Sequence, residues 1–164
     1  MSFDRQVHSG GIIIFLTFVV AMMIMIVPLP EWAKSYRPEI MVMVLIYWCL
    51  ALPDRIGVGT GWFAGLMLDV GHGSLLGQHA LAMAIVAWVT VNLHQRIRVF
   101  PTWQQALSVL ILVGLNQMLV LWVKGITGQS PQVWIYWMPS ITSMLLWPWL
   151  FLVLRSIRRN FKVN

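Results

Sequence analysis

Residues 40–70 read IMVMVLIYWCLALPDRIGVGTGWFAGLMLDV, and this stretch decides the fold class. It consists of two apolar runs separated by a short polar break at residues 53–55. The same alternation of apolar runs and short polar breaks continues along the chain in both directions. Apolar runs with charges confined to the breaks are typical of helices packed in lipid. The sequence therefore predicts an all-α integral membrane protein.

The composition excludes most soluble classes. Charged residues make up 10% of the chain and hydrophobic residues 59%, whereas about a quarter of a soluble domain is charged. The net charge is +6, but the basic residues lie at the ends of apolar runs, where membrane topology places them. No nucleic-acid partner is therefore expected. The single cysteine, Cys49, excludes an intramolecular disulfide.

The chain is predicted to form one transmembrane domain over residues 1–164, with six spans. The predicted spans cover about residues 11–27, 40–52, 56–70, 75–93, 106–123 and 133–154. A span needs ~20 apolar residues, so the second and third segments are short and either sit inside the bundle or thin the bilayer locally. The first segment lacks a small-x-small cleavage site, so it is interpreted as a span rather than a cleavable signal peptide.

The distribution of basic residues predicts the orientation. With six spans, both termini lie on the same side of the membrane. That side receives eight basic residues: Arg5, Arg55, Arg96, Arg98, Arg155, Arg158, Arg159 and Lys162. The other side receives Lys34, Arg37 and Lys124. Because basic residues are enriched in cytoplasmic loops, both termini are expected in the cytoplasm, with residues 31–37 and 128–132 on the periplasmic side.

Seven of the twelve glycines lie between residues 57 and 77. Gly61 and Gly65 form a small-xxx-small step, which lets another helix approach closely. Two interpretations stay open: tight packing of a short helix, or a groove for a partner helix or ligand formed by Gly57, Gly59, Gly61 and Gly65. A nucleotide-binding loop is excluded because no strand precedes these glycines.

Asp69 is the acidic residue inside the predicted spans. Fourteen residues of helix from Arg55 cover ~21 Å, short of a ~30 Å hydrocarbon core, so the carboxyl group needs polar partners. It could accept backbone hydrogen bonds and fix the glycine-rich turn, with the amides around Gly71 and Gly73 available. In that case asparagine would replace much of its role.

Two other interpretations of Asp69 stay open. The carboxyl group could help to form a polar binding pocket, with Gly73 and Gly77 as neighbours. It could also belong to a metal or proton-relay site with His72 and His79, although the spacing of these three residues is loose.

Signatures of common enzymes are missing from the sequence. There is no His-Glu-x-x-His and no Gly-x-Ser-x-Gly motif. Ser74 lies near two histidines, but no recognisable nucleophile motif surrounds it. The other carboxylates are predicted at membrane interfaces: Asp4, Glu31, Glu39 and Asp54. We therefore expect no catalytic activity, metal or cofactor.

Several different short motifs are spread along nearly the whole chain. They are Arg37-Pro38, Tyr47-Trp48, Ala51-Leu52-Pro53, Arg55, Val58-Gly59-Thr60-Gly61, Gly65, Asp69, Gly73, Leu76-Gly77, Trp103-Gln104-Gln105-Ala106 and Leu146-Trp147-Pro148-Trp149. In these residues the chain resembles the MreD family of rod shape-determining bacterial membrane proteins. Asp69 and the glycines belong to the family pattern, whereas His72 and His79 do not.

The resemblance implies a non-catalytic scaffold or regulator of peptidoglycan synthesis during cell elongation, in the bacterial inner membrane. The implied partners are the single-pass protein MreC, the actin-like MreB, the glycosyltransferase RodA and its partner transpeptidase. The family is also similar to the substrate-binding components of energy-coupling vitamin transporters. The alternative function is therefore a small-solute-binding component of a transporter, which would show an enclosed polar pocket.

Overall fold

The computed structural model describes residues 3–129 and 134–163, and side chains from Gly10 onward within those ranges. Helices account for 81% of the described residues, and these residues contain no strand, which confirms the all-α class. The elements are α1 (Phe3–Ile26), α2 (Glu31–Lys34), α3 (Ile40–Ala51), α4 (Val58–His72), α5 (Gln78–Val99), α6 (Thr102–Ile126), the 3-10 helix η1 (Ile135–Trp137) and α7 (Met138–Asn160).

Each of the six predicted apolar segments corresponds to one α-helix, and all of these helices except α3 extend beyond the predicted segment at one end or both. α5 continues through Arg96 and Arg98 in its last turn, and α6 begins directly after Pro101. Backbone hydrogen bonding does not stop where side chains become polar, whereas Pro101 has no amide hydrogen to donate and so favours a break between α5 and α6. Residues 130–133, which include part of the predicted second periplasmic loop and the start of the sixth segment, lie outside the described residues, as does Asn164.

Three helices in the described ranges are long and apolar enough to cross a membrane. They are Gln78–Val99, Thr102–Ile126 and the continuous helical stretch Ile135–Asn160. Gly10–Ile26 and Ile40–Ala51 are apolar but shorter. The chain is thus a membrane protein by its helices, and the number of six spans stays a prediction.

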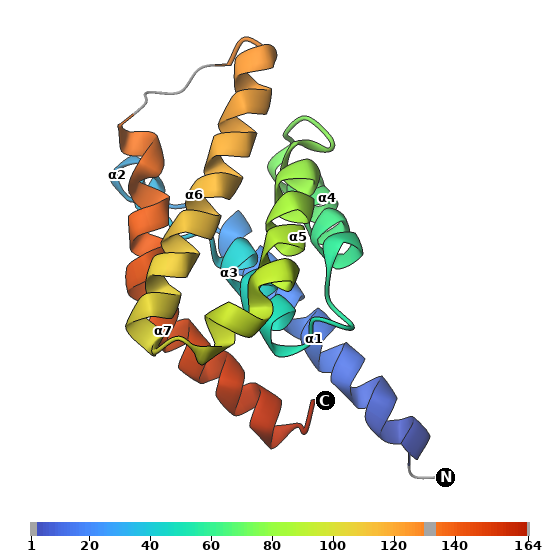
Figure 1. Ribbon diagram of the computed structural model, residues 1–164. Coiled ribbons are helices and arrows are strands. Elements are labelled where there is room, and N and C mark those ends of the chain that lie inside the picture. The colour runs from blue at the N-terminus through green and yellow to red at the C-terminus, as the bar shows by residue number, and fades with distance from the viewer. Residues whose placement is uncertain (1–2, 130–133, 164) are drawn as a thin grey trace.

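The helices run back and forth between two ends of the molecule (Figure 1). The chain ends lie at the same end, at the bottom of the view, together with the α3–α4 and α5–α6 connections. The α4–α5 turn and the C-terminal end of α6 lie at the opposite end. Both termini at one end is the arrangement expected of a chain that crosses a bilayer an even number of times. We call the end that carries the chain termini the terminal end.

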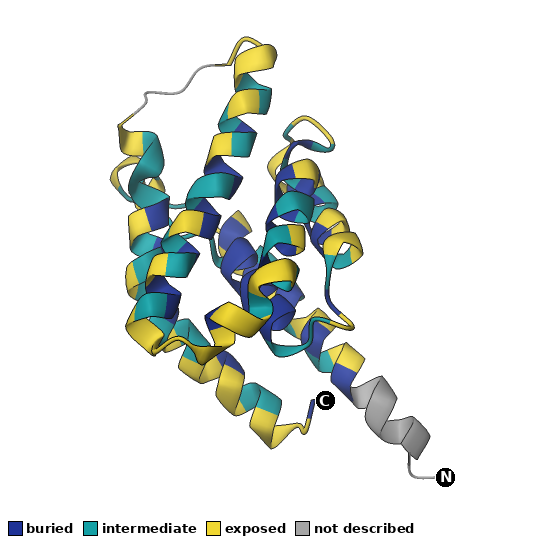
Figure 2. Ribbon diagram, viewed as in Figure 1, coloured by how far each residue is buried: buried dark blue, intermediate teal, exposed yellow. Residues whose placement is uncertain are grey.

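α3 forms the core of the molecule. Residues 41–50 are all buried, and α3 packs against α1, α5, α6 and α7. Figure 2 shows α3 as a nearly continuous dark segment among helices with mixed colours. Its 12 residues cover about 18 Å, which is too short to cross ~30 Å of hydrocarbon. Because other helices cover it on all sides, the short second segment sits inside the bundle.

The outer faces of the surrounding helices remain apolar. Large hydrophobic side chains are exposed along α1, α6 and α7, including Phe15, Ile111 and Leu152. A water-soluble protein seldom exposes apolar surface of this extent. These faces are therefore suited to contact lipid chains or helices of other membrane proteins.

Candidate functional site

The candidate site starts at the close contact between α4 and α5. A Cβ atom added to Gly65 would lie 2.4 Å from Cα of Ala80, and one added to Gly61 would lie 2.8 Å from the carbonyl oxygen of Met83. Real Cβ atoms do not approach backbone atoms so closely. The two glycines thus let α5 of the same chain lie directly against α4, which is the packing interpretation of this step.

A tight turn of residues 73–77 connects the two helices. Gly73 caps the C-terminus of α4 with φ of +63°, and Gly77 precedes α5 with φ of +99°. Positive φ values strain residues that carry a Cβ atom, so both positions favour glycine. The amide of Ser74 donates to the Asp69 carbonyl oxygen at 3.1 Å, which closes the end of α4.

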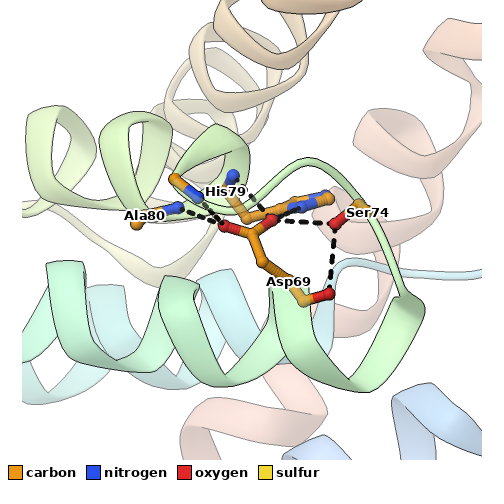
Figure 3. Close-up of polar contacts among 5 residues, drawn as sticks. Asp69, Ser74, His79 and Ala80 are labelled. Carbon is orange, nitrogen blue, oxygen red and sulfur yellow. Dashed lines mark hydrogen bonds and ion pairs between the residues drawn. The ribbon is translucent and has the colours of Figure 1, made fainter.

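The carboxylate of Asp69 is fully buried and points from α4 into the start of α5 (Figure 3). Its Oδ1 accepts from the Ser74 hydroxyl at 2.9 Å and from the His79 amide at 3.0 Å, and lies 2.7 Å from His79 Nδ1. Its Oδ2 accepts from the amides of Gly77 at 2.9 Å and Ala80 at 3.4 Å. The carboxylate thus accepts backbone hydrogen bonds at the glycine-rich turn, and the amides that supply them are those of Gly77, His79 and Ala80 rather than those around Gly71 and Gly73.

The donors come from the far side of the turn for a geometric reason. The first amides of α5 have no carbonyl partner within their own helix. They point at the carboxylate because α4 and α5 are antiparallel and lie close together. A carboxylate has about four lone-pair positions, and these contacts occupy them. Asp69 therefore joins α4, the turn and the first turn of α5 into one unit.

His72 is not part of this hydrogen-bond network. It is exposed, and its ring centroid lies 6.0 Å from that of His79. Within the described ranges, no group of three His, Cys, Asp or Glu side chains is placed to hold a metal ion. Ser74 uses its hydroxyl to bind Asp69. The geometry thus favours a structural role for the carboxylate.

An open cavity of about 720 Å³ adjoins the turn. Polar groups from three elements line it, namely His72, Ser74, Gln78, His79, Lys124, Thr127 and Gln129. Nε2 of Gln78 is buried without a hydrogen-bond partner within the described structure. The cavity therefore has a polar floor, but it opens to the outside at the end of the bundle opposite the termini.

The family model of the rod shape-determining protein MreD matches residues 7–157. A relative, the rod shape-determining protein MreD of Haemophilus influenzae (strain ATCC 51907 / DSM 11121 / KW20 / Rd), is 32% identical over 147 residues, which cover 90% of this chain and 91% of the relative. The chain belongs to the MreD family. No solved structure matches it.

Arg37, one of the residues in which the sequence resembles the MreD family, caps the C-terminus of α1. Its guanidinium group donates to the carbonyl oxygen of Val27 at 2.7 Å and also to that of Ile24. The last carbonyl groups of a helix lack partners, and a cation is favourable near them. Pro38 follows directly and precedes α3, so this pair holds the connection between α1 and α3.

Further residues in which the sequence resembles the MreD family lie around the start of α4. Pro53 follows Leu52, the C-cap of α3, and so helps to end this helix. Arg55 is exposed, with Nη1 3.6 Å from the position that a Cβ atom of Gly10 would take. Gly57 and Gly59 have open space around them, so the structure does not bring them together with Gly61 and Gly65 at the α4–α5 contact.

Sequence reasoning missed a second buried polar cluster, between α6 and α7. Gln117 Nε2 donates to the Tyr136 carbonyl oxygen at 3.0 Å, and the Tyr136 hydroxyl donates to the Gln117 carbonyl oxygen at 3.0 Å. The Ser140 hydroxyl donates to Oε1 of Gln117. The signal was present in the sequence as Asn116-Gln117 within an otherwise apolar run.

Glu39 was also missed, because it was assigned to an interface. It precedes α3, its amide donates to the Ser143 hydroxyl at 3.0 Å, and its side chain is half-buried. Burial raises the pKa of the Glu39 carboxyl to about 7, against the opposing effects of Lys124 and Arg37. This carboxyl group is therefore only partly ionised at neutral pH.

Proposed function

We propose that this member of the MreD family is a non-catalytic scaffold of the cell-elongation complex in the bacterial inner membrane. It spans the membrane six times with both termini in the cytoplasm, and it binds the transmembrane helix of MreC. RodA, its partner transpeptidase and MreB are the further partners that this proposal includes. Rod shape would then depend on the assembly that the chain holds together.

A lateral groove between α1 and α4 carries the proposal. It has a volume of about 320 Å³ and is lined almost entirely by apolar side chains and a glycine: Gly11, Ile14, Phe15, Phe18, Val19, Met22, Met41, Phe63, Ala64 and Met67, with Thr60 as the hydroxyl. We call it the α1–α4 groove. Its shape and chemistry suit side chains of one further helix, since helix association in lipid relies on close packing.

The use of Asp69 supports the non-catalytic part of the proposal. A group that takes part in acid–base catalysis must reach a substrate, but this carboxylate is buried and occupied by donors of its own chain. The buried polar cluster around Gln117 is likewise paired within α6, η1 and α7. Both clusters hold helices in place.

Filling the α1–α4 groove tests the proposal. Gly11 lines the groove, whereas Gly125 lies near the end of α6 away from it, and both are exposed with no atom within 4 Å of an added Cβ. Gly11→Leu is expected to reduce the amount of MreC that co-purifies and to abolish rod shape in cells, while Gly125→Leu retains both. Equal co-purification of MreC with both variants would contradict the proposed docking site.

A transport role is the second candidate, and the polar cavity with the unpaired Gln78 amide favours it. A solute-binding protein would hold a small molecule there by hydrogen bonds. Native mass spectrometry of the purified protein separates the two functions. The scaffold role predicts no stoichiometric small solute, whereas a bound solute that is lost in Gln78→Leu would contradict this prediction and favour the transport role.

A further inference from the structure

Two adjoining cavities form a basic cleft at the terminal end of the molecule. The first has a volume of about 320 Å³ and is lined by Tyr47, Leu50, Ala51, Arg98, Gln105, Phe151, Arg155 and Arg158. The second, of about 440 Å³, is lined by Arg155, Arg158, Arg159, Lys162 and Val163. The cavities share two arginines, so we treat them as one arginine cleft.

The cations of the arginine cleft come from separate elements that the fold brings together. Arg98 lies in the last turn of α5 and Arg158 in the last turn of α7, while Lys162 belongs to the tail after α7. The enrichment of basic residues on one side of a membrane requires charges at helix ends. It does not require them to converge on one cavity, so a ligand is the simpler explanation of the convergence.

The C-terminal tail is folded so that it completes the cleft. Val163 is buried, and its Cγ1 lies 3.5 Å from the position of a Cβ atom on Gly10 in α1. Nε of Arg158 donates to the Val163 carbonyl oxygen at 3.3 Å. These contacts hold the Arg158 side chain and the tail in place, which reduces the ordering that binding would require.

None of these cations has a carboxylate partner among the side chains that the structure describes. The ion pairs there are Lys34 with Glu31 and Asp69 with His79, both distant from the cleft in the chain and in the fold. Arginine groups whose charge is not neutralised by a carboxylate attract phosphate, which they can bind through two parallel hydrogen bonds. The arginine cleft is therefore suited to a phosphate group.

The walls of the cleft indicate what else the ligand carries. Leu50, Ala51 and Phe151 form an apolar wall beside the arginines, which suits an acyl chain. Gln105 is buried, its Nε2 donates to the Ile97 carbonyl oxygen at 3.3 Å, and its Oε1 has no partner within the described residues. A free acceptor of this kind suits a hydroxyl group of the ligand.

We propose that the arginine cleft binds an anionic phospholipid whose headgroup carries hydroxyl groups, of the phosphatidylglycerol type. The arginines bind the phosphodiester, Gln105 accepts a hydrogen bond from a headgroup hydroxyl, and the apolar wall contacts the acyl chain. This inference needs only that the chain is a membrane protein. It is independent of the proposed scaffold role and of MreC binding.

Native mass spectrometry of the delipidated full chain tests the inference, with phosphatidylglycerol and phosphatidylcholine of identical acyl chains as probes. The double variant Arg155→Gln/Arg158→Gln removes two charges from the cleft. Lys34→Gln/Arg96→Gln removes two charges from residues that do not line the cleft, and is the matched control. Helical content and elution volume of both variants show whether they fold.

Phosphatidylglycerol is expected to bind in preference to phosphatidylcholine. The cleft variant should weaken this binding by about tenfold or more, because a basic residue near a lipid surface contributes roughly a factor of five. The control variant should retain the preference. Equal weakening in both variants, or no preference in the unmodified chain, would overturn the inference. If inorganic phosphate or glycerol phosphate at the same concentration displaced phosphatidylglycerol, the cleft would be a site for a free phosphate compound and the inference would be wrong.

Discussion

Asp69 shows how one side chain can fix a turn by accepting hydrogen bonds from backbone amides that have no helical partner. The amides of Gly77, His79 and Ala80 lie at the start of α5, where a helix offers them no carbonyl partner. They converge on the two carboxylate oxygens of Asp69 instead. Because the Asp69 carboxylate is fully buried, water does not reach it, and the protein itself supplies the partners of these amides. A carboxylate is favoured over an amide side chain because both of its oxygens accept.

Substitution of Asp69 separates structure from chemistry. The sequence-based expectation that asparagine would replace much of the role of Asp69 does not fit the geometry, because both carboxylate oxygens accept hydrogen bonds. Asparagine keeps one acceptor but turns an NH2 group toward donors, so Asp69→Asn should lower the level of folded protein. Asp69→Leu should lower it further, at roughly 1–3 kcal/mol per unpaired buried group. Rod shape should follow the protein level in both variants, measured by quantitative blotting and microscopy. A normal level of Asp69→Asn with loss of rod shape would show a chemical role instead.

The α4–α5 pair is the element that depends most on small residues. An added Cβ at Gly65 would overlap the backbone of Ala80, whereas Gly59 on the same helix has open space around it. Gly65→Ala should therefore destabilise the folded protein by about 1–3 kcal/mol, the usual cost of overpacking. This change should appear as a lower midpoint temperature of thermal unfolding in mild detergent. Gly59→Ala should leave the midpoint unchanged or raise it slightly, since alanine favours a helix. Equal midpoints would show that α5 shifts away from α4 without cost.

Apolar runs and prolines were enough to predict the six long helices, because both features act locally along the chain. The partners of Asp69 and the convergence of Arg98 with Arg155 were not predictable, because they depend on which helices become neighbours. The polar pair Asn116-Gln117 shows an intermediate case. Its position in an apolar run indicates a buried partner, but only the fold identifies that partner as Tyr136 and Ser140.

For the whole molecule, the basic residues and the path of the chain lead to the same topology. The termini and the helix ends with Arg96, Arg98, Arg158 and Arg159 lie at one end, and the ends of α2 and α6 with Lys34 and Lys124 lie at the other. A reporter that is active only in the periplasm should be silent after the last residue and active next to Lys34. Activity at the C-terminus would contradict the six-span topology.

The central claim is that the chain acts by holding a partner helix in the α1–α4 groove, and crosslinking in living cells tests it most directly. A photoreactive residue at Phe15 or Phe63 lies in the groove, and one at Leu152 on α7 is the control, with exposed fractions of 61%, 53% and 60%. Illumination is predicted to join the chain to MreC from Phe15 and Phe63 but not from Leu152. Crosslinks to MreC from Leu152 alone would contradict the claim.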